Sequence, residues 1–211
     1  LCSTIFPLYK KVYEQNKVTE ADLYPLIDAF RNTNITDICL NVGGQCSGSP
    51  SNVLDDLVSI YERRVENGIP VDYREMLAPA YTVIKIHGID PFDVWFRRIR
   101  EAGMRSHISV RMNDCHCPDD KTCWLRSGFF YTARQNGWMN GDRYGYFRYT
   151  LNYKYPEVRN LYLNYIREQI LRYDTDGLEL DFMREAYCIG VGREAEGVAV
   201  MNRFMREVKA L

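Results

Sequence analysis

Two hydrophobic periodicities alternate along the chain. Apolar residues recur at helical spacing in several segments, for example Phe92, Val94, Trp95 and Ile99. Five helices are predicted on this basis, over residues 20–32, 51–64, 90–102, 156–173 and 193–210. Short β-rich runs between them predict strands over residues 35–42, 105–112, 144–153 and 178–182. A polar and aromatic insertion, residues 113–143, separates the second and third of these runs.

This order of elements predicts an α/β fold built from parallel βα units, arranged as an open sheet or as a barrel. No Gly-x-Gly-x-x-Gly follows a strand, which removes the usual reason to choose a nucleotide-binding open sheet. Carboxylate and amide side chains gather instead where the strands end, as in a (β/α)8 TIM barrel. Four or five strands are too few to close such a barrel. We therefore expect residues 1–211 to be a single, incomplete TIM-barrel-type domain, the N-terminal half or more of a longer barrel.

Charge and cysteine usage narrow the possible partners. The 27 basic and 28 acidic side chains give a net charge of −1, which predicts no general attraction to nucleic acid or to anionic lipid. No apolar stretch approaches the length of a membrane span, so no membrane partner is expected. Seven cysteines are an odd number, and three of them crowd between Cys115 and Cys123. Plain thiols or a local disulfide explain them more simply than a metal site, and no cofactor is predicted.

The last predicted strand, Leu178 to Phe182, carries acidic residues on one face. Side chains alternate along a strand, so Glu179 and Asp181 share the face opposite the apolar residues. A carboxylate at the rim of a core is costly unless it is paired or functional. An ion pair with Arg111 of the neighbouring strand is the structural alternative for both. We predict a functional role for Asp181 and favour the structural one for Glu179.

The second strand presents a similar polar face and ends in a cluster of polar residues. Asn113 could donate a hydrogen bond to a substrate hydroxyl, and Asp114 follows it directly. His116 could act as a base, an acid or a ligand, although a single histidine in a loop is usually none of these. Asn41 occupies the matching place on the first strand, before two glycines that could serve a ligand or only the turn.

Aromatic residues are concentrated in the insertion and just beyond it. Eleven of them fall between Trp124 and Tyr155. Aromatic faces stack on sugar rings, and pockets of this kind combine apolar walls with a few polar groups. Most of these rings could equally fasten a long loop to the fold. The complete set of predicted substrate-binding residues is Asn41, Arg111, Asn113, His116, Glu179, Trp124, Trp138 and Tyr153.

Three segments resemble one family. They are Ser109 to Asp114 with His116, Leu151 to Arg159, and Asp176 to Arg184. Together they look like the bacterial family 10-like glycosylhydrolases, a group of glycoside-hydrolase-like TIM-barrel proteins. This resemblance implies a TIM barrel that acts on carbohydrate. The chain departs from the related chitinase signature, because Met183 stands where that signature has its catalytic glutamate.

Glycosidic cleavage generally requires two carboxyl groups. The predicted function is therefore hydrolysis of an O-glycosidic bond in a poly- or oligosaccharide, with Asp181 as nucleophile or base and Asp114 or Glu185 as the acid. Two alternatives stay open. One is a metal-assisted hydrolase that uses Asp114, His116 and Asp181, and the other is a carbohydrate-binding barrel without activity.

Overall fold

The computed structural model describes residues 12, 17–71, 77–116, 126–183 and 185–211. Three strands form its sheet: β1 (Asp37–Gly43), β2 (Arg105–Arg111) and β3 (Gly177–Asp181). The longer helices are α3 (Leu57–Glu66), α5 (Pro91–Glu101), α6 (Gly128–Gln135), α7 (Pro156–Arg172) and α8 (Glu194–Lys209). The shorter helical segments are η1 (Glu20–Leu23), α2 (Pro25–Asp28), α4 (Leu77–Tyr81), η2 (Thr82–Ile86) and η3 (Asp142–Tyr149).

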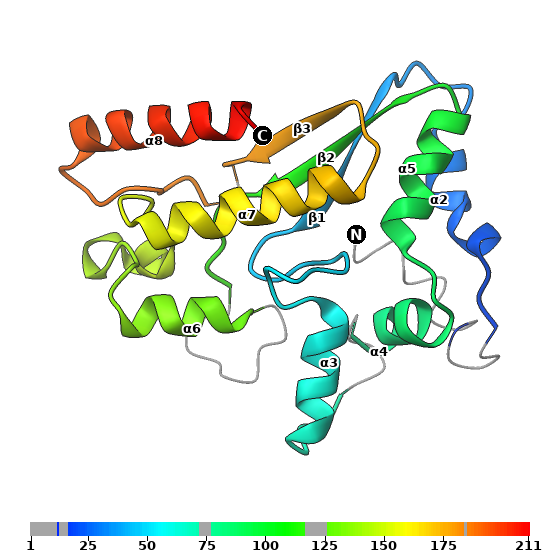
Figure 1. The fold of residues 1–211 in the computed structure, drawn as a ribbon, viewed down its shortest axis with the longest axis horizontal. Coiled ribbons are helices and arrows are strands. Elements are labelled where there is room, and N and C mark those ends of the chain that lie inside the picture. The colour runs from blue at the N-terminus through cyan, green and yellow to red at the C-terminus, as the bar shows by residue number, and fades with distance from the viewer. Residues whose placement is uncertain (1–11, 13–16, 72–76, 117–125, 184) are drawn as a thin grey trace.

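All three strands run parallel, in the order β1-β2-β3. The register places Asn41 opposite Ser109, and Ser109 opposite Glu179. One step further along the sheet, Arg111 lies opposite Asp181. The strands therefore finish at one common edge, from which the loops after β1, β2 and β3 all leave (Figure 1).

Helices cover one face of this sheet. Alternate residues such as Val42, Ile108 and Val110 are fully buried on that face, in the main core with Trp95 of α5 and Ile166 of α7. Figure 1 shows α7 crossing the sheet, with α5 beside its amino-terminal half and α8 near β3. The alternation predicted for residues 178–182 is confirmed in β3, because its leucines pack against the core whereas Glu179 is exposed.

The prediction of an incomplete (β/α)8 TIM-barrel-type fold is wrong. The described residues form a mixed α/β fold with one three-stranded parallel sheet, whereas a barrel of that type closes from eight strands. Alternating strands and helices indicate parallel pairing but leave the number of strands and their closure undetermined. The strand predicted over residues 144–153 is largely the 3₁₀ segment η3. Its Gly145 has φ 53° and ψ −119°, a conformation incompatible with an extended strand.

Local capping explains where the helices begin. α5 starts after Asp90, whose side chain accepts a hydrogen bond from the Phe92 amide, and a proline occupies the first turn of both α5 and α7. These two starts agree with the prediction. The helix predicted from Ser51 begins only at Leu57, because Asp56 caps it by accepting from the Ser59 amide at 2.8 Å. None of the helices in the described residues combines the length and apolar character that crossing a bilayer requires.

Candidate functional site

Polar side chains from three loops meet at the carboxyl-terminal edge of the sheet. Gln45 follows β1, Asp114 follows β2, and Glu185 follows β3. Loops at this edge of a parallel sheet are the usual place for ligands, because strand ends bring chain segments of distant sequence together. All three residues are buried, so their polar atoms must find partners inside the protein or in a ligand.

Asp114 is the centre of this cluster. Its Oδ2 accepts from Arg111 Nη1 at 2.8 Å, and its Oδ1 accepts from Gln45 Nε2 at 2.9 Å. The main-chain amide of His116 donates to the same Oδ1 at 2.9 Å, and His116 Nδ1 is hydrogen-bonded to it as well. Burial raises the pKa of Asp114, but these donors outweigh that effect and hold its pKa below the usual value. Asp114 is therefore a fixed, ionised carboxylate.

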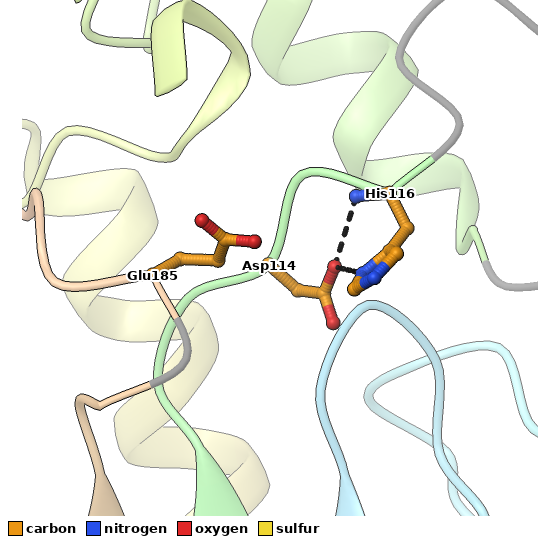
Figure 2. A group of neighbouring side chains, drawn as sticks. All are labelled: Asp114, His116 and Glu185. Atoms are coloured by element: carbon orange, nitrogen blue, oxygen red, sulfur yellow. Dashed lines mark hydrogen bonds and ion pairs between the residues drawn. The ribbon is translucent and has the colours of Figure 1, made fainter. Parts of the chain in front are cut away.

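Glu185 faces this carboxylate from the loop after β3. One ligating atom each from Asp114, His116 and Glu185 can be chosen so that all lie within 4.8 Å of one another (Figure 2). Glu185 is only 3% exposed, and its Oε2 has no hydrogen-bond partner among the described residues. An unsatisfied buried carboxyl oxygen is costly, so this atom marks a place where a ligand could bind.

A second layer of side chains supports the cluster. Gln45 Nε2 also donates to the carbonyl of His116 at 3.0 Å, and Arg126 donates to the same carbonyl from Nη2 at 3.1 Å. Arg126 Nε lies 3.3 Å from Gln45 Oε1. These contacts fix the main chain around His116. Sequence reasoning missed both Gln45 and Arg126, since a glutamine after two glycines and an arginine in a loop carry no local signal of burial.

The sheet face opposite the helices is polar and open to solvent. Cys39 of β1 and Glu179 of β3 are exposed there, while Asn41, Arg111 and Asp181 are half-buried. Asp181 Oδ1 accepts a hydrogen bond from the Met183 amide at 2.9 Å. The ion pair expected between Arg111 and Asp181 does not form, because Arg111 pairs with Asp114 instead. Within the described residues, neither Glu179 nor Asp181 takes part in an ion pair.

The amino-terminal end of the same face is held by charge pairing. Asp37 accepts from Arg105 Nη2 at 2.8 Å and contacts His107 Nε2 at 2.7 Å. The hydrogen bond from Arg105, and then that from His107, keep the pKa of Asp37 well below its ordinary value. This group joins β1 to β2, far along the strands from the carboxyl-terminal edge.

Several predicted site residues prove to hold the fold together. Asn113 is fully buried, with its Nδ2 donating to the carbonyls of Leu151 and Tyr187 and its Oδ1 accepting from the Leu151 amide. Tyr153 is fully buried too, and its hydroxyl donates to the Met112 carbonyl. Neither side chain has a polar atom left for a sugar. Trp138 is half-buried against Phe129, with ring centroids 5.9 Å apart.

The remaining predictions concern an aromatic residue, the cysteines and a metal-binding group. Trp124, Cys117 and Cys123 lie outside the described residues. Of the described cysteines, Cys39 and Cys188 are free thiols. The grouping of Asp114 and His116 with Asp181, assumed for a metal-assisted hydrolase, is replaced by a grouping with Glu185.

No model of a known protein family matches the chain, and no characterised protein matches it significantly. The resemblance to family 10-like glycosylhydrolases therefore stays a prediction from three sequence segments.

Proposed function

We propose that the protein hydrolyses glycosidic bonds with Asp181 and Glu179 as its carboxyl pair. The observation that supports this proposal is that both carboxylates lie on the open sheet face without an ion pair among the described residues. Arg111, the obvious neutralising partner, is engaged by Asp114 at 2.8 Å. Two unpaired carboxylates on the same face of a strand repel each other. Their presence together therefore suggests a role in binding or chemistry.

The spacing of the pair suggests how it would act. Residues two apart on a strand are separated by roughly 6.5–7 Å, which falls at the lower limit of the ~6.5–9.5 Å typical of inverting glycosidases. Asp181, nearer the loops, would activate water as the base. Glu179 would protonate the leaving oxygen as the acid. The proposal thus expects inversion at the anomeric carbon.

Neighbouring side chains could orient the sugar. Asn41 and Ser109 lie in the same row across the sheet as Glu179, and Arg111 lies in the row of Asp181. Amide, hydroxyl and guanidinium groups suit the hydroxyls of a saccharide, since each supplies a directed donor or acceptor. A saccharide lying across the sheet would meet Asn41 and Arg111 beside the two carboxylates, whereas Ser109 is buried beneath it.

The test is hydrolysis of a panel of aryl glycosides and of plant and algal polysaccharides. Asp181→Asn should lower turnover by about 10²–10⁴-fold, as expected when a general acid or base is lost, and Glu179→Gln should do the same. Asp174→Asn changes an exposed aspartate before β3 and serves as the matched control. Proton NMR of the first product would report inversion.

Unchanged turnover in Asp181→Asn would remove this residue from the mechanism. Saccharide binding by the wild type without any release of product would instead favour the non-catalytic, carbohydrate-binding alternative. Retention of configuration would contradict the assignment of Glu179 as the second carboxyl group.

A further inference from the structure

We propose that Asp114, His116 and Glu185 form a binding site for a divalent transition-metal cation, with Zn²⁺ as the best match. The site goes beyond the proposed glycosidic hydrolysis and does not depend on it, because its residues differ from the Asp181–Glu179 pair. It would connect the loop that follows β2 to the loop that follows β3.

The first support for the site is that its candidate ligand atoms lie close together, with both carboxylates buried. The candidate ligand atoms of the three residues lie within 4.8 Å of one another. Ligand atoms of a tetrahedral zinc site are about 3.4 Å apart, because each lies about 2.1 Å from the ion. Modest side-chain rotations would close that difference. Figure 2 shows the carboxylate of Glu185 directed toward Asp114, with the His116 ring on the far side of that aspartate.

The second support is independent of proximity. Glu185 Oε2 is buried and has no hydrogen-bond partner in the described part of the chain. The whole residue is 3% exposed, so bulk water cannot solvate the carboxylate. Burying a carboxylate is costly unless it is paired, hydrogen-bonded or bound to a metal. A cation between Glu185 and Asp114 would supply the missing partner.

The nearby arginines are engaged elsewhere, which leaves a metal cation rather than a basic side chain as the partner of Glu185. Arg111 contacts Asp114 through Oδ2, which leaves Oδ1 on the side of His116. Arg126 is directed at Gln45 Oε1 and at the His116 carbonyl. Among the described residues, no hydrogen bond or ion pair joins Glu185 to the guanidinium group of Arg111 or Arg126.

Asp114 is already oriented for ligation. Gln45 and the His116 amide hold its Oδ1, and Arg111 holds its Oδ2, so the carboxylate loses little freedom when it binds a metal. Outer partners of this kind orient ligands in known metal sites. Ligation by His116 uses an unprotonated imidazole nitrogen, so any proton on the nitrogen that ligates is released to solvent.

The donor set selects the metal. An imidazole nitrogen with two carboxylates suits Zn²⁺ or Mn²⁺, whereas Ca²⁺ and Mg²⁺ prefer oxygen ligands alone. Three protein ligands would leave at least one coordination position for water. Zn²⁺ binds such a set more tightly than Mn²⁺.

The test is titration of the chelator-treated full chain with ZnCl₂ by calorimetry, with elemental analysis of the metal that remains after gel filtration. The wild type should bind one Zn²⁺ per chain. Glu185→Gln and His116→Gln should each weaken binding by at least about 10–100-fold, the loss found when merely an outer partner is removed. Glu157→Gln and His87→Gln, which change the same residue types outside the cluster, should bind as the wild type does.

A second variant and a second metal keep the outcome decisive. His116 has a side chain 29% exposed, so His116→Gln should fold even if Glu185→Gln does not. Co²⁺ in place of Zn²⁺ should give visible ligand-field bands without the absorption of a cobalt–thiolate bond. A thiolate band, equal Zn²⁺ affinity in the cluster variants and the wild type, or no binding by the wild type would each overturn the proposal.

Discussion

Arg111 shows how one side chain decides the state of several others. The register places it opposite Asp181, yet its guanidinium pairs with Asp114. The Asp114 side chain is only 6% exposed, so its charge interacts with Arg111 through a medium of lower effective dielectric than water. Asp181 is half-buried and can keep part of its hydration. The ion pair thus forms where it lowers the electrostatic energy most, and it leaves Asp181 available.

Burial also gives the cysteines different thiol reactivities. Burial raises the pKa of Cys188 to about 12, although a hydrogen bond with Asn113 opposes this effect. Burial and the nearby Glu179 raise the pKa of Cys39 as well, but Cys39 remains exposed on the open sheet face. The thiolate is the reactive form, so both its population and its access differ between these two residues.

We expect iodoacetamide at pH 9 to label Cys39 in the native protein while Cys188 stays protected. Because the pKa of Cys188 is higher in the folded chain, its contribution to stability is complete below the unfolded value of ~8.5 and is lost as the pH rises toward 12. Peptide mass mapping measures the labelling. Cys188→Ala should reduce the fall in stability between about pH 8.5 and 10, before the tyrosines titrate. Equal labelling of both thiols would contradict this assignment.

At the scale of elements, the end of β1 is joined to α7 by a tyrosine. The Tyr165 hydroxyl lies 2.8 Å from Ser47 Oγ and donates to the Val42 carbonyl at 3.0 Å. Gly43 lies directly under that hydroxyl, so β1 and α7 can approach this closely only without a side chain at position 43. The turn that carries Gln45 into the cluster therefore depends on a glycine.

Gly43→Ala is expected to destabilise the protein by about 2–3 kcal/mol, the usual cost of overpacking combined with strained hydrogen bonds. The added methyl group would clash with the Tyr165 hydroxyl and lie 2.9 Å from the Cys46 carbonyl. Urea unfolding measures the change. Gly128→Ala, whose added methyl group would meet Asp55 at an ordinary 3.7 Å, should be nearly neutral. Similar effects for the two variants would show that β1 and α7 do not depend on this contact.

At the scale of the whole molecule, α8 docks through one aromatic anchor. Phe204 is fully buried, with its ring centroid 5.4 Å from that of Tyr153 and the two rings nearly perpendicular. Tyr153 in turn stacks on Tyr162 of α7 at 5.4 Å. This stack links α8, α7 and the segment after η3, and it explains why Tyr153 serves the core.

Phe204→Ala should cost about 3–5 kcal/mol, the typical loss for deleting a buried aromatic ring. Its neighbour Met205 is 43% exposed, so Met205→Ala should change stability by no more than ~0.5 kcal/mol. Chemical denaturation of both variants compares them directly. A small effect of Phe204→Ala would mean that α8 is held mainly by other contacts.

The local pattern of residues determined much of the architecture. The proline starts of α5 and α7, the three parallel strands and the alternation of Glu179 with its leucine neighbours could all be predicted, because periodicity and capping act over a few residues. Short helical segments such as η3 escaped prediction, since aromatic residues there also suit a strand.

Tertiary structure alone decided how many strands pair and which loops meet. Asp114 and Glu185 stand 71 positions apart in the sequence, and only the shared edge of the sheet brings them together. The burial of Gln45, the partner that Arg111 takes and the fully used amide of Asn113 also depend on residues distant in the chain. Such contacts carry no periodicity, because their energy comes from the surroundings that the complete fold creates.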